Sequence, residues 1–308
     1  MIRVATVQFE PRPGAEEYNF ARVEHFARAA ADDAVQLVAF PELCLVGNRH
    51  LARRCAGYLR RLAEPEDGPS IVRVRALAQR LSIGIGVGLL TERGGSLFNS
   101  YAVCLPDGAV HIHHKLHASA YEGISDGGGY TVFDTPWGVR VGVLICLDNN
   151  IVENVRATAL LGAQILLAPH QTGGTHSMIP FGEDPIPVSV WENRATDPGA
   201  VEDAFRGTTG REWPLRCLPA RAHDNGMFIV FSNGVGRDDD EVRTGNAMLV
   251  DPSGRIIAES LAIADDMVAA DLDLDQAAAS VGQWWTRFRR PELYRPLVDV
   301  STGSSTYE

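Results

Sequence analysis

The sequence lacks features that define several large classes of proteins. No uninterrupted apolar stretch approaches the roughly 20 residues that a membrane-spanning helix needs. Basic residues are not in excess either, since 28 lysines and arginines stand against 39 acidic residues, for a formal net charge of −11. Nucleic acids and anionic membranes bind proteins through basic patches. The composition therefore predicts that neither is a partner.

Cysteine is scarce and follows no recognisable pattern. The five cysteines are odd in number and widely scattered, without a C-x-x-C pair. This distribution is typical of reduced thiols and not of a disulfide framework or a zinc site. Residues 1–9 read as a strand, and no apolar leader with a cleavage site follows them. We therefore expect a cytoplasmic protein without a metal centre.

The apolar residues that are present are arranged in alternating elements. With 308 residues, 45% of them hydrophobic, the chain can bury a large core. Helical periodicity appears near 16–33, 69–81 and 150–162, and the patterning predicts strands near 3–9, 35–40, 83–90, 98–105, 109–115, 139–146, 164–168, 227–233, 245–251, 255–260 and 267–273. No repeat or linker divides the chain, so we expect one domain over 1–280 and a tail over 281–308 that could dock on another subunit. Many strands with few long helices predict two sheets faced together with helices outside.

Cys146 is the most informative single residue. It follows the apolar run 141–145 and precedes a helix-like segment, which puts it on a sharp turn between strand and helix. Such a turn exposes the sulfur, and the backbone N–H groups nearby favour a thiolate and an oxyanion. The position predicts a nucleophile, provided that a base and a cation lie beside it.

Two charged residues end other predicted strands and could serve this cysteine. Glu42 follows the apolar run 37–40 through Pro41, and Lys115 ends the run that begins at His111. A carboxylate there could move protons, and an ammonium could stabilise a negative oxygen. Each residue alone is most simply structural. Three strand ends with complementary chemistry together indicate an active site.

The motifs around these residues resemble the nitrilase superfamily of carbon–nitrogen hydrolases in order and spacing. They are Phe40-Pro41-Glu42, His114-Lys115-Leu116 and Leu144-Ile145-Cys146-Leu147-Asp148. Weaker agreement extends from Val4-Ala5-Thr6-Val7-Gln8 to Arg290-Pro291-Glu292, so the resemblance covers nearly the whole chain. It implies an α/β fold, the four-layer α-β-β-α sandwich, which commonly assembles into homodimers or larger homo-oligomers, and it implies no cofactor.

The resemblance also implies a mechanism and further site residues. Glu42 would deprotonate Cys146, and Lys115 with the backbone N–H of Leu147 would hold the oxyanion of the intermediate that leads to a thioester. A second glutamate often assists in this family, and Glu122 is the nearest candidate; the alternative is a solvent-exposed loop carboxylate. The residues expected to line the substrate pocket are Tyr121, Leu147, Asn149, His170, Gln171 and Thr172.

The residues after the cysteine bear on the substrate. Nitrile hydrolysers of this superfamily typically continue with Trp-Glu, whereas this chain has Leu147 and Asp148. We therefore expect hydrolysis of a small amide or N-carbamoyl compound with release of ammonia. A true nitrilase and a non-catalytic binding or regulatory member of the same fold remain alternatives, although the latter would be expected to have lost one of the three central residues.

Three other segments attract attention. A stretch over about 173–212 is rich in Gly, Pro and charge, and we expect a long loop that is either a lip over the active site or a passive surface excursion. The histidines near Lys115 resemble a metal cluster, but no cysteine or carboxylate nearby completes it. We therefore expect strand-surface positions on the substrate side. These residues are His111, His113, His114 and His117. The acidic run 238–241 is expected to be a solvated hairpin loop.

Overall fold

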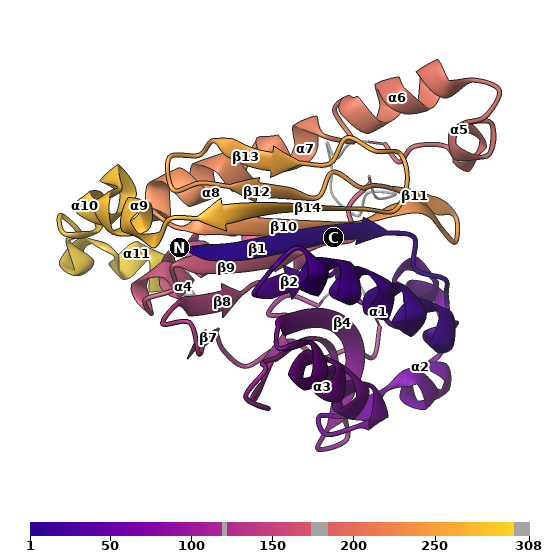
Figure 1. Ribbon diagram of the computed structural model, residues 1–308, viewed down its shortest axis with the longest axis horizontal. Helices are drawn as coiled ribbons and strands as arrows, with labels where there is room; N and C mark the ends of the chain where they lie inside the picture. The colour runs from indigo at the N-terminus through magenta and orange to yellow at the C-terminus, as the bar shows by residue number, and fades with distance from the viewer. Residues whose placement is uncertain (119–121, 174–183, 299–308) are drawn as a thin grey trace.

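The computed structural model describes residues 1–118, 122–173 and 184–298 and shows two half-sheets facing each other (Figure 1). The first half-sheet has the order β6-β5-β4-β2-β1 and comprises β1 (Ile2–Phe9), β2 (Leu37–Ala39), β4 (Gly84–Arg93), β5 (Ser96–Cys104) and β6 (Val110–His114). The second has the order β10-β9-β8-β7 and comprises β7 (Thr131–Asp134), β8 (Arg140–Val143), β9 (Ile165–Pro169) and β10 (Phe228–Asp238). The halves join where the ends of β1 and β10 pair in parallel, at Gln8–Asn233 and Phe9–Gly234.

Shorter strands extend this framework. β14 (Asp266–Leu272) runs antiparallel to β1, and β3 (Glu64–Pro65) pairs with β4. β11 (Glu241–Thr244) and β12 (Met248–Val250) both pair with β10, and β13 (Ile256–Glu259) pairs with β12. The strands that were predicted from the apolar patterning are therefore confirmed, with shifts of a few residues at their ends, whereas β3, β7 and β11 were not predicted.

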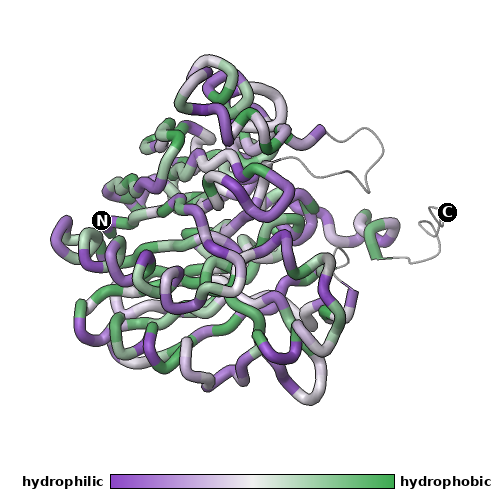
Figure 2. Tube along the Cα trace, turned by 90° about the vertical axis from the view of Figure 1, so that its right-hand side faces the viewer, coloured by the Kyte–Doolittle hydropathy of each residue, from purple (hydrophilic) through white to green (hydrophobic). Residues whose placement is uncertain are grey.

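Apolar side chains fill the space between the half-sheets and the space outside each of them. Val4, Leu37 and Tyr101 of the first half pack with Val141 and Val230 of the second. A second cluster lies between the first half-sheet and the helices α1 (Glu16–Asp32) and α3 (Pro69–Leu81), and a third lies between the second half-sheet and α4 (Val152–Leu160) and α8 (Leu218–Asn225). Figure 2 accordingly shows hydrophobic segments of the trace in the middle of the molecule. The α/β fold is the expected α-β-β-α sandwich.

Local sequence explains where the outer helices begin and end. Helix α3 starts with Pro69 in its first turn, where a missing N–H costs nothing, and buries Ile71, Val74 and Leu77 on one face. It stops at Ser82, which adopts a left-handed conformation with φ of 59°. Helix α8 ends in the same way at Gly226, with φ of 60°. No helix within the described ranges is both long and apolar enough to span a membrane.

The expectation of a long loop over 173–212 is wrong for its second half. Residues 188–206 form α5 (Val188–Glu192) and α6 (Pro198–Arg206), which lie at one end of the sandwich (Figure 1). Trp191, Val201 and Phe205 from these helices pack on Val235 and Val242. In α6 the buried residues Val201 and Phe205 are four apart, as on one face of a helix, but a pattern that covers so few residues does not by itself indicate a helix. Helix α7 (Glu212–Leu215) follows, and residues 174–183 lie outside the described part.

The acidic hairpin is also different from expectation. Asp238 and Glu241 are each 1% exposed and share the guanidinium of Arg243, which is 2% exposed, at 2.8 and 2.9 Å. Arg49 adds an ion pair to Glu241 at 3.1 Å. The prediction of a solvated loop holds for Asp239, which is exposed at the turn, and is wrong for Asp238 and Glu241. The arginines that compensate these two acids come from β11 and from η1 (Arg49–Arg53), a segment remote in sequence.

The remaining described helices are short. Helix α2 (Ala56–Leu62) packs on β4, and η2 (Cys146–Asn149) precedes α4. Helix α9 (Leu274–Ala279) precedes the expected tail, whose described part, 281–298, contains α10 (Val281–Thr286), η3 (Pro291–Leu293) and α11 (Arg295–Val298). These four elements lie at the end away from α5 and α6 (Figure 1). Residues 299–308 are outside the described part.

Candidate active site

The candidate active site lies where several strands end. Glu42 follows β2, Lys115 follows β6 directly and Cys146 begins η2 just after β8. Strand β2 runs parallel to β1 and β4, β8 runs parallel to β9, and β9 runs parallel to β10, whereas β6, which precedes Lys115, is antiparallel to β5. Residues that follow parallel strands meet at one edge of a sheet, which is where α/β proteins commonly bind ligands.

Glu42 and Lys115 form a buried ion pair. Lys115 Nζ lies 2.7 Å from Glu42 Oε1, and the two residues are 5% and 1% exposed. The Nδ2 of Asn99, on β5, donates to the same Oε1 at 2.7 Å. Lys115 is also the only lysine in the chain, since every other cation is an arginine. Each buried charge is thus compensated by a partner, as burial requires.

The backbone is strained immediately beside both Glu42 and the cysteine. Leu43 and Cys146 have φ angles of 48° and 49°, in the left-handed region that costs a residue with a side chain about 1–3 kcal/mol. The turn after Glu42 is held by Gly47 N–H, which donates to Leu43 O at 2.8 Å. Gly88 packs against it so closely that a Cβ there would lie 2.1 Å from Leu43 N. These strained turns direct the two side chains into the site.

The Cys146 thiol is protonated at neutral pH. Burial and the negative charge of Glu42 raise its pKa to about 11, while the positive charge of Lys115 acts in the opposite direction. The residue is half-buried. Because the thiolate and not the thiol is the nucleophile, the thiol needs a base before it can attack.

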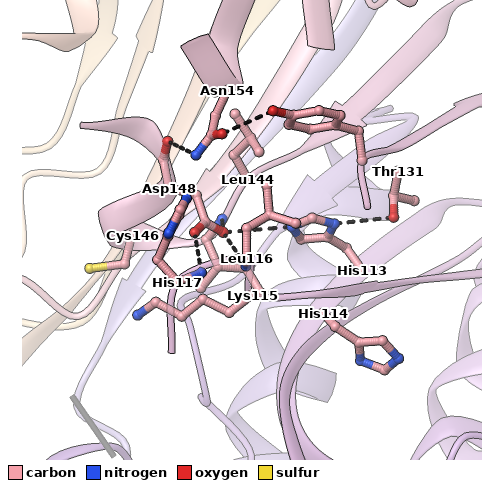
Figure 3. Close-up of polar contacts among 12 residues, drawn as sticks. His113, His114, Lys115, Leu116, His117, Thr131, Leu144, Cys146, Asp148 and Asn154 are labelled. Atoms are coloured by element: carbon pink, nitrogen blue, oxygen red, sulfur yellow. Dashed lines mark hydrogen bonds and ion pairs between the residues drawn. The ribbon is translucent and has the colours of Figure 1, made fainter. Parts of the chain in front are cut away.

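Asp148 connects the lysine segment to the cysteine turn (Figure 3). Its fully buried carboxylate accepts hydrogen bonds from the backbone N–H groups of Leu116 at 3.1 Å, His117 at 3.0 Å and Ile145 at 3.1 Å. Burial alone would raise the pKa of Asp148, but the hydrogen bonds it accepts and the positive charges near it outweigh burial, so the pKa is lowered. Asp148 thus holds residues adjacent to both Lys115 and Cys146.

Of the histidines near Lys115, His113 and His114 are buried and not on a strand surface as expected, whereas His111 and His117 are half-buried. His113 Nδ1 lies 3.1 Å from Thr131 Oγ1, and its Nε2 lies 3.7 Å from Asp148 Oδ2 (Figure 3). His114 is held between Ser100 and Glu66 at 2.8 and 2.9 Å. Surrounding strands cover both rings, which the alternation of one strand could not reveal. Among the described residues no three potential ligands converge on a metal site.

Some of the residues expected to line the substrate pocket are buried close to Cys146. His170 and Gln171 are buried after β9, and Thr172 Oγ1 lies 4.0 Å from Cys146 Sγ. Gln171 Nε2 donates to the backbone oxygen of Glu42 at 2.9 Å. Asn149, within η2, is fully buried beneath the cysteine.

The other expected site residues lie at the surface or beyond the described ranges. Glu122 is exposed on a turn, and Tyr121 lies outside the described residues. Leu147 is half-buried, and its N–H donates no hydrogen bond to a residue that the structure describes. That N–H therefore remains available to an oxyanion.

Two site residues were not predicted in the roles that they have. Asn99 donates to Glu42, and Asn233, in β10, accepts from Thr172 N–H at 2.8 Å. Both are polar residues within strands that are otherwise apolar and buried. A polar side chain in such a strand was the available signal, but it does not say which partner the side chain reaches.

Comparison with known proteins identifies the family. The family model described as carbon-nitrogen hydrolase matches residues 3–280. An (R)-stereoselective amidase from Pseudomonas sp. is 30% identical over 91% of this chain and 88% of its own length. An N-carbamoylputrescine amidase from Solanum tuberosum is 25% identical over 97% of this chain and 96% of its own. The chain therefore belongs to the carbon–nitrogen hydrolase family, and it is an enzyme that acts on C–N bonds other than peptide bonds.

Solved structures show the same fold. A mutant of the amidase from Nesterenkonia sp. AN1, whose active-site cysteine carries the acetamide moiety of fluoroacetamide, superposes with a TM-score of 0.71. The two sequences are 21% identical, and the match covers 96% of each chain. Another mutant of that amidase, in complex with butyramide, gives a TM-score of 0.69 at 22% identity and also covers 96% of each chain.

Proposed function

We propose that Glu42, Lys115 and Cys146 hydrolyse a small amide or N-carbamoyl compound through a thioester on Cys146, with release of ammonia. The observation that carries this proposal is the buried Glu42–Lys115 pair at 2.7 Å, beside a cysteine whose thiol is protonated at neutral pH. A carboxylate next to such a thiol can accept its proton without changing the net charge of the site. The ammonium of Lys115 compensates the negative charge, which lies on Glu42 before this transfer and on Cys146 after it.

Each chemical step has a group suited to it. Glu42 takes the proton from Cys146, and the thiolate attacks the carbonyl carbon of the substrate. The oxygen becomes negative and is stabilised by Lys115 and by the available N–H of Leu147. Glu42 then protonates the departing nitrogen, and later it deprotonates the water that hydrolyses the thioester. One carboxylate thus acts as base, acid and base again.

An amide is favoured over a nitrile. The cysteine is followed by Leu147 and Asp148 and not by the Trp-Glu that is typical of nitrile hydrolysers, and the relatives named above are amidases. We also propose Glu122 as the assisting second glutamate and Tyr121 as a substrate contact, because the family resemblance implies a second glutamate after the lysine.

The test is ammonia release from a panel of primary amides, ω-amides, carbamoyl amines and nitriles. We expect turnover of an amide or carbamoyl compound by the native chain and none by Cys146→Ala. Cys217→Ala is the matched control, because it removes another half-buried thiol that lies outside the site. Turnover of nitriles alone would refute the amide assignment. Silence across the panel, with Cys146 inert to iodoacetamide, would favour a non-catalytic role.

We also propose that the protein is a cytoplasmic homo-oligomer. All five cysteines are unpaired thiols, as a reducing compartment requires. Large apolar side chains are exposed on the C-terminal elements, including Trp284 at 53%, Phe288 at 63% and Leu297 at 63%. A second copy of the chain would cover them. Light scattering on the purified protein tests this, and a monomeric mass at all concentrations would contradict it.

A further inference from the structure

A chain of three polar side chains ends at the nucleophilic sulfur. Asn149 Nδ2 lies 3.2 Å from His170 Nε2, and His170 Nδ1 lies 3.3 Å from Thr172 Oγ1. Thr172 Oγ1 in turn lies 4.0 Å from Cys146 Sγ. Asn149 belongs to η2, whereas His170 and Thr172 follow β9, so two elements meet behind the cysteine.

The direction of these hydrogen bonds follows from the first residue. Asn149 Nδ2 lies 2.8 Å from Leu144 O and 3.3 Å from Cys146 O, so the amide must present its nitrogen to these two acceptors. Because an amide nitrogen only donates, His170 Nε2 must accept. The ring proton is therefore on Nδ1. Burial lowers the pKa of His170 to about 3, so the ring is neutral throughout the working pH range.

Among the described residues, the hydroxyl of Thr172 has two hydrogen-bonding partners, His170 Nδ1 and Cys146 Sγ. It accepts from His170 Nδ1–H, which leaves its own O–H to point toward the sulfur. The backbone of Thr172 is fixed on both sides, because its N–H donates to Asn233 Oδ1 at 2.8 Å and its carbonyl accepts from Asn233 Nδ2 at 3.1 Å. The hydroxyl is thus held at a defined place before substrate arrives.

We propose that the Thr172 hydroxyl is a catalytic group that donates a hydrogen bond to the Cys146 thiolate, and that His170 is a positioning residue that orients this hydroxyl. The inference rests on the proposed function in taking Cys146 as the nucleophile. The proton of the thiol still goes to Glu42, and Thr172 keeps its own. The hydrogen bond strengthens whenever the sulfur becomes negative, before attack and again when the thioester is hydrolysed.

This role differs from the substrate contacts that the sequence suggested for these residues. His170 is 3% exposed, and both ring nitrogens have partners within the protein. No ring atom therefore remains to bind a substrate group. The rings of His170 and Phe231 pack in an edge-to-face arrangement with centroids 4.9 Å apart, which further fixes the imidazole.

The test measures the rate at which iodoacetamide alkylates Cys146 as a function of pH, read by peptide mass spectrometry without substrate. Thr172→Val keeps the shape and removes the hydroxyl. We expect the apparent thiol pKa to rise by about one unit, so that alkylation below that pKa becomes about tenfold slower. Thr172→Ser restores the hydroxyl and should stay within about twofold of the native rate. Thr6→Val is the control, since it removes a buried hydroxyl outside the site.

His170 is tested through its dependence on Thr172. His170→Phe keeps a ring against Phe231 but removes the Nδ1 donor, and it should raise the thiol pKa in the same direction. The double variant His170→Phe/Thr172→Val should be no more perturbed than Thr172→Val alone, because His170 acts through the hydroxyl. Additive shifts would overturn the positioning role.

Two further outcomes separate this inference from the proposed function. An unchanged pH profile in Thr172→Val, with a reduced kcat/KM for an amide, would overturn the thiolate contact and assign Thr172 to the substrate. A shifted pH profile in a protein that hydrolyses no member of the amide panel would support the contact and refute the proposed function instead.

Discussion

Asp148→Asn is the substitution that examines most directly how the site is held together. Asp148 Oδ2 accepts from both Leu116 N–H and Ile145 N–H, and Oδ1 accepts from His117 N–H. Asparagine has a single side-chain oxygen. If that oxygen takes the place of Oδ2, the NH2 group faces the N–H of His117, and two donors oppose each other in a fully buried position.

The magnitude follows from these contacts. A hydrogen bond to a charged group contributes about 1.5–3 kcal/mol, and a buried donor without a partner costs about 1–3 kcal/mol. Allowing for partial relaxation, we expect the free energy of unfolding to fall by about 2–4 kcal/mol. Lys115 and Cys146 each lie next to a residue that Asp148 holds, so a shift of their positions should lower kcat/KM about 100-fold.

The effect on stability should depend on pH with a defined sign. Hydrogen bonds and nearby positive charges overcome burial and lower the pKa of Asp148 in the folded state below its ordinary value of 3.8. Its carboxylate therefore stabilises the fold above that value, and this stabilisation is lost as the pH falls below it. The difference in stability between native protein and Asp148→Asn should be constant above about pH 5 and decrease toward pH 3.

Urea unfolding from pH 8 to 3, together with ammonia release, measures both quantities. Asp251→Asn is the matched control, because Asp251 is 7% exposed and holds Ser253 N–H and Arg255 N–H with the same oxygen, Oδ1. Asparagine can reproduce that arrangement. The reasoning fails if Asp148→Asn loses less than about 0.5 kcal/mol, which is ordinary for a surface change, or if the control is equally impaired.

Three other substitutions examine the framework. Gly88→Ala would place a methyl group 2.1 Å from Leu43 N, so we expect poorly soluble or inactive protein; a soluble variant with native kcat/KM would contradict the geometry. Tyr101→Phe removes the hydroxyl that donates to Phe40 O at 2.8 Å, and the urea midpoint should fall by the equivalent of about 1–3 kcal/mol, which an unchanged midpoint would refute. Arg243→Leu deprives two buried acids of the hairpin β10–β11 of a shared cation, and calorimetry should show a loss of about 3–5 kcal/mol at pH 7; a loss below 1 kcal/mol would contradict it.

The parts of the fold that were predicted from the sequence have strong local patterns. Helix α3 was expected at 69–81 and has those bounds, because a proline begins it and apolar residues repeat along one face. The strand before Cys146 and the turn that bears it were expected from an unbroken apolar run. The α-β-β-α arrangement followed from the number of strands and from the family resemblance. Local patterning was sufficient wherever an element is long and one of its faces is buried.

The predictions that were wrong concern residues whose partners are remote in the chain. Helices α5 and α6 are short, and they are stabilised by packing on Val235 and Val242 more than by their own pattern. Asp238 was expected in solvent, but Arg49, far away in sequence, covers it. His113 was expected at a surface because the strand that covers it could not be located from one sequence.

The chemical identity of the site was determined by the sequence alone. Glu42, Lys115 and Cys146 follow strands, and their types suit the proposed roles of base, cation and nucleophile before any coordinates are considered. Only the tertiary structure decided which groups surround them. The contacts of Glu42 with Asn99, of Asp148 with three backbone N–H groups and of Thr172 with Asn233 join strands separated by many residues. The type of a residue sets what its side chain can donate or accept. The pairing of strands sets the distance to its partner, and hydrogen bonds depend steeply on that distance.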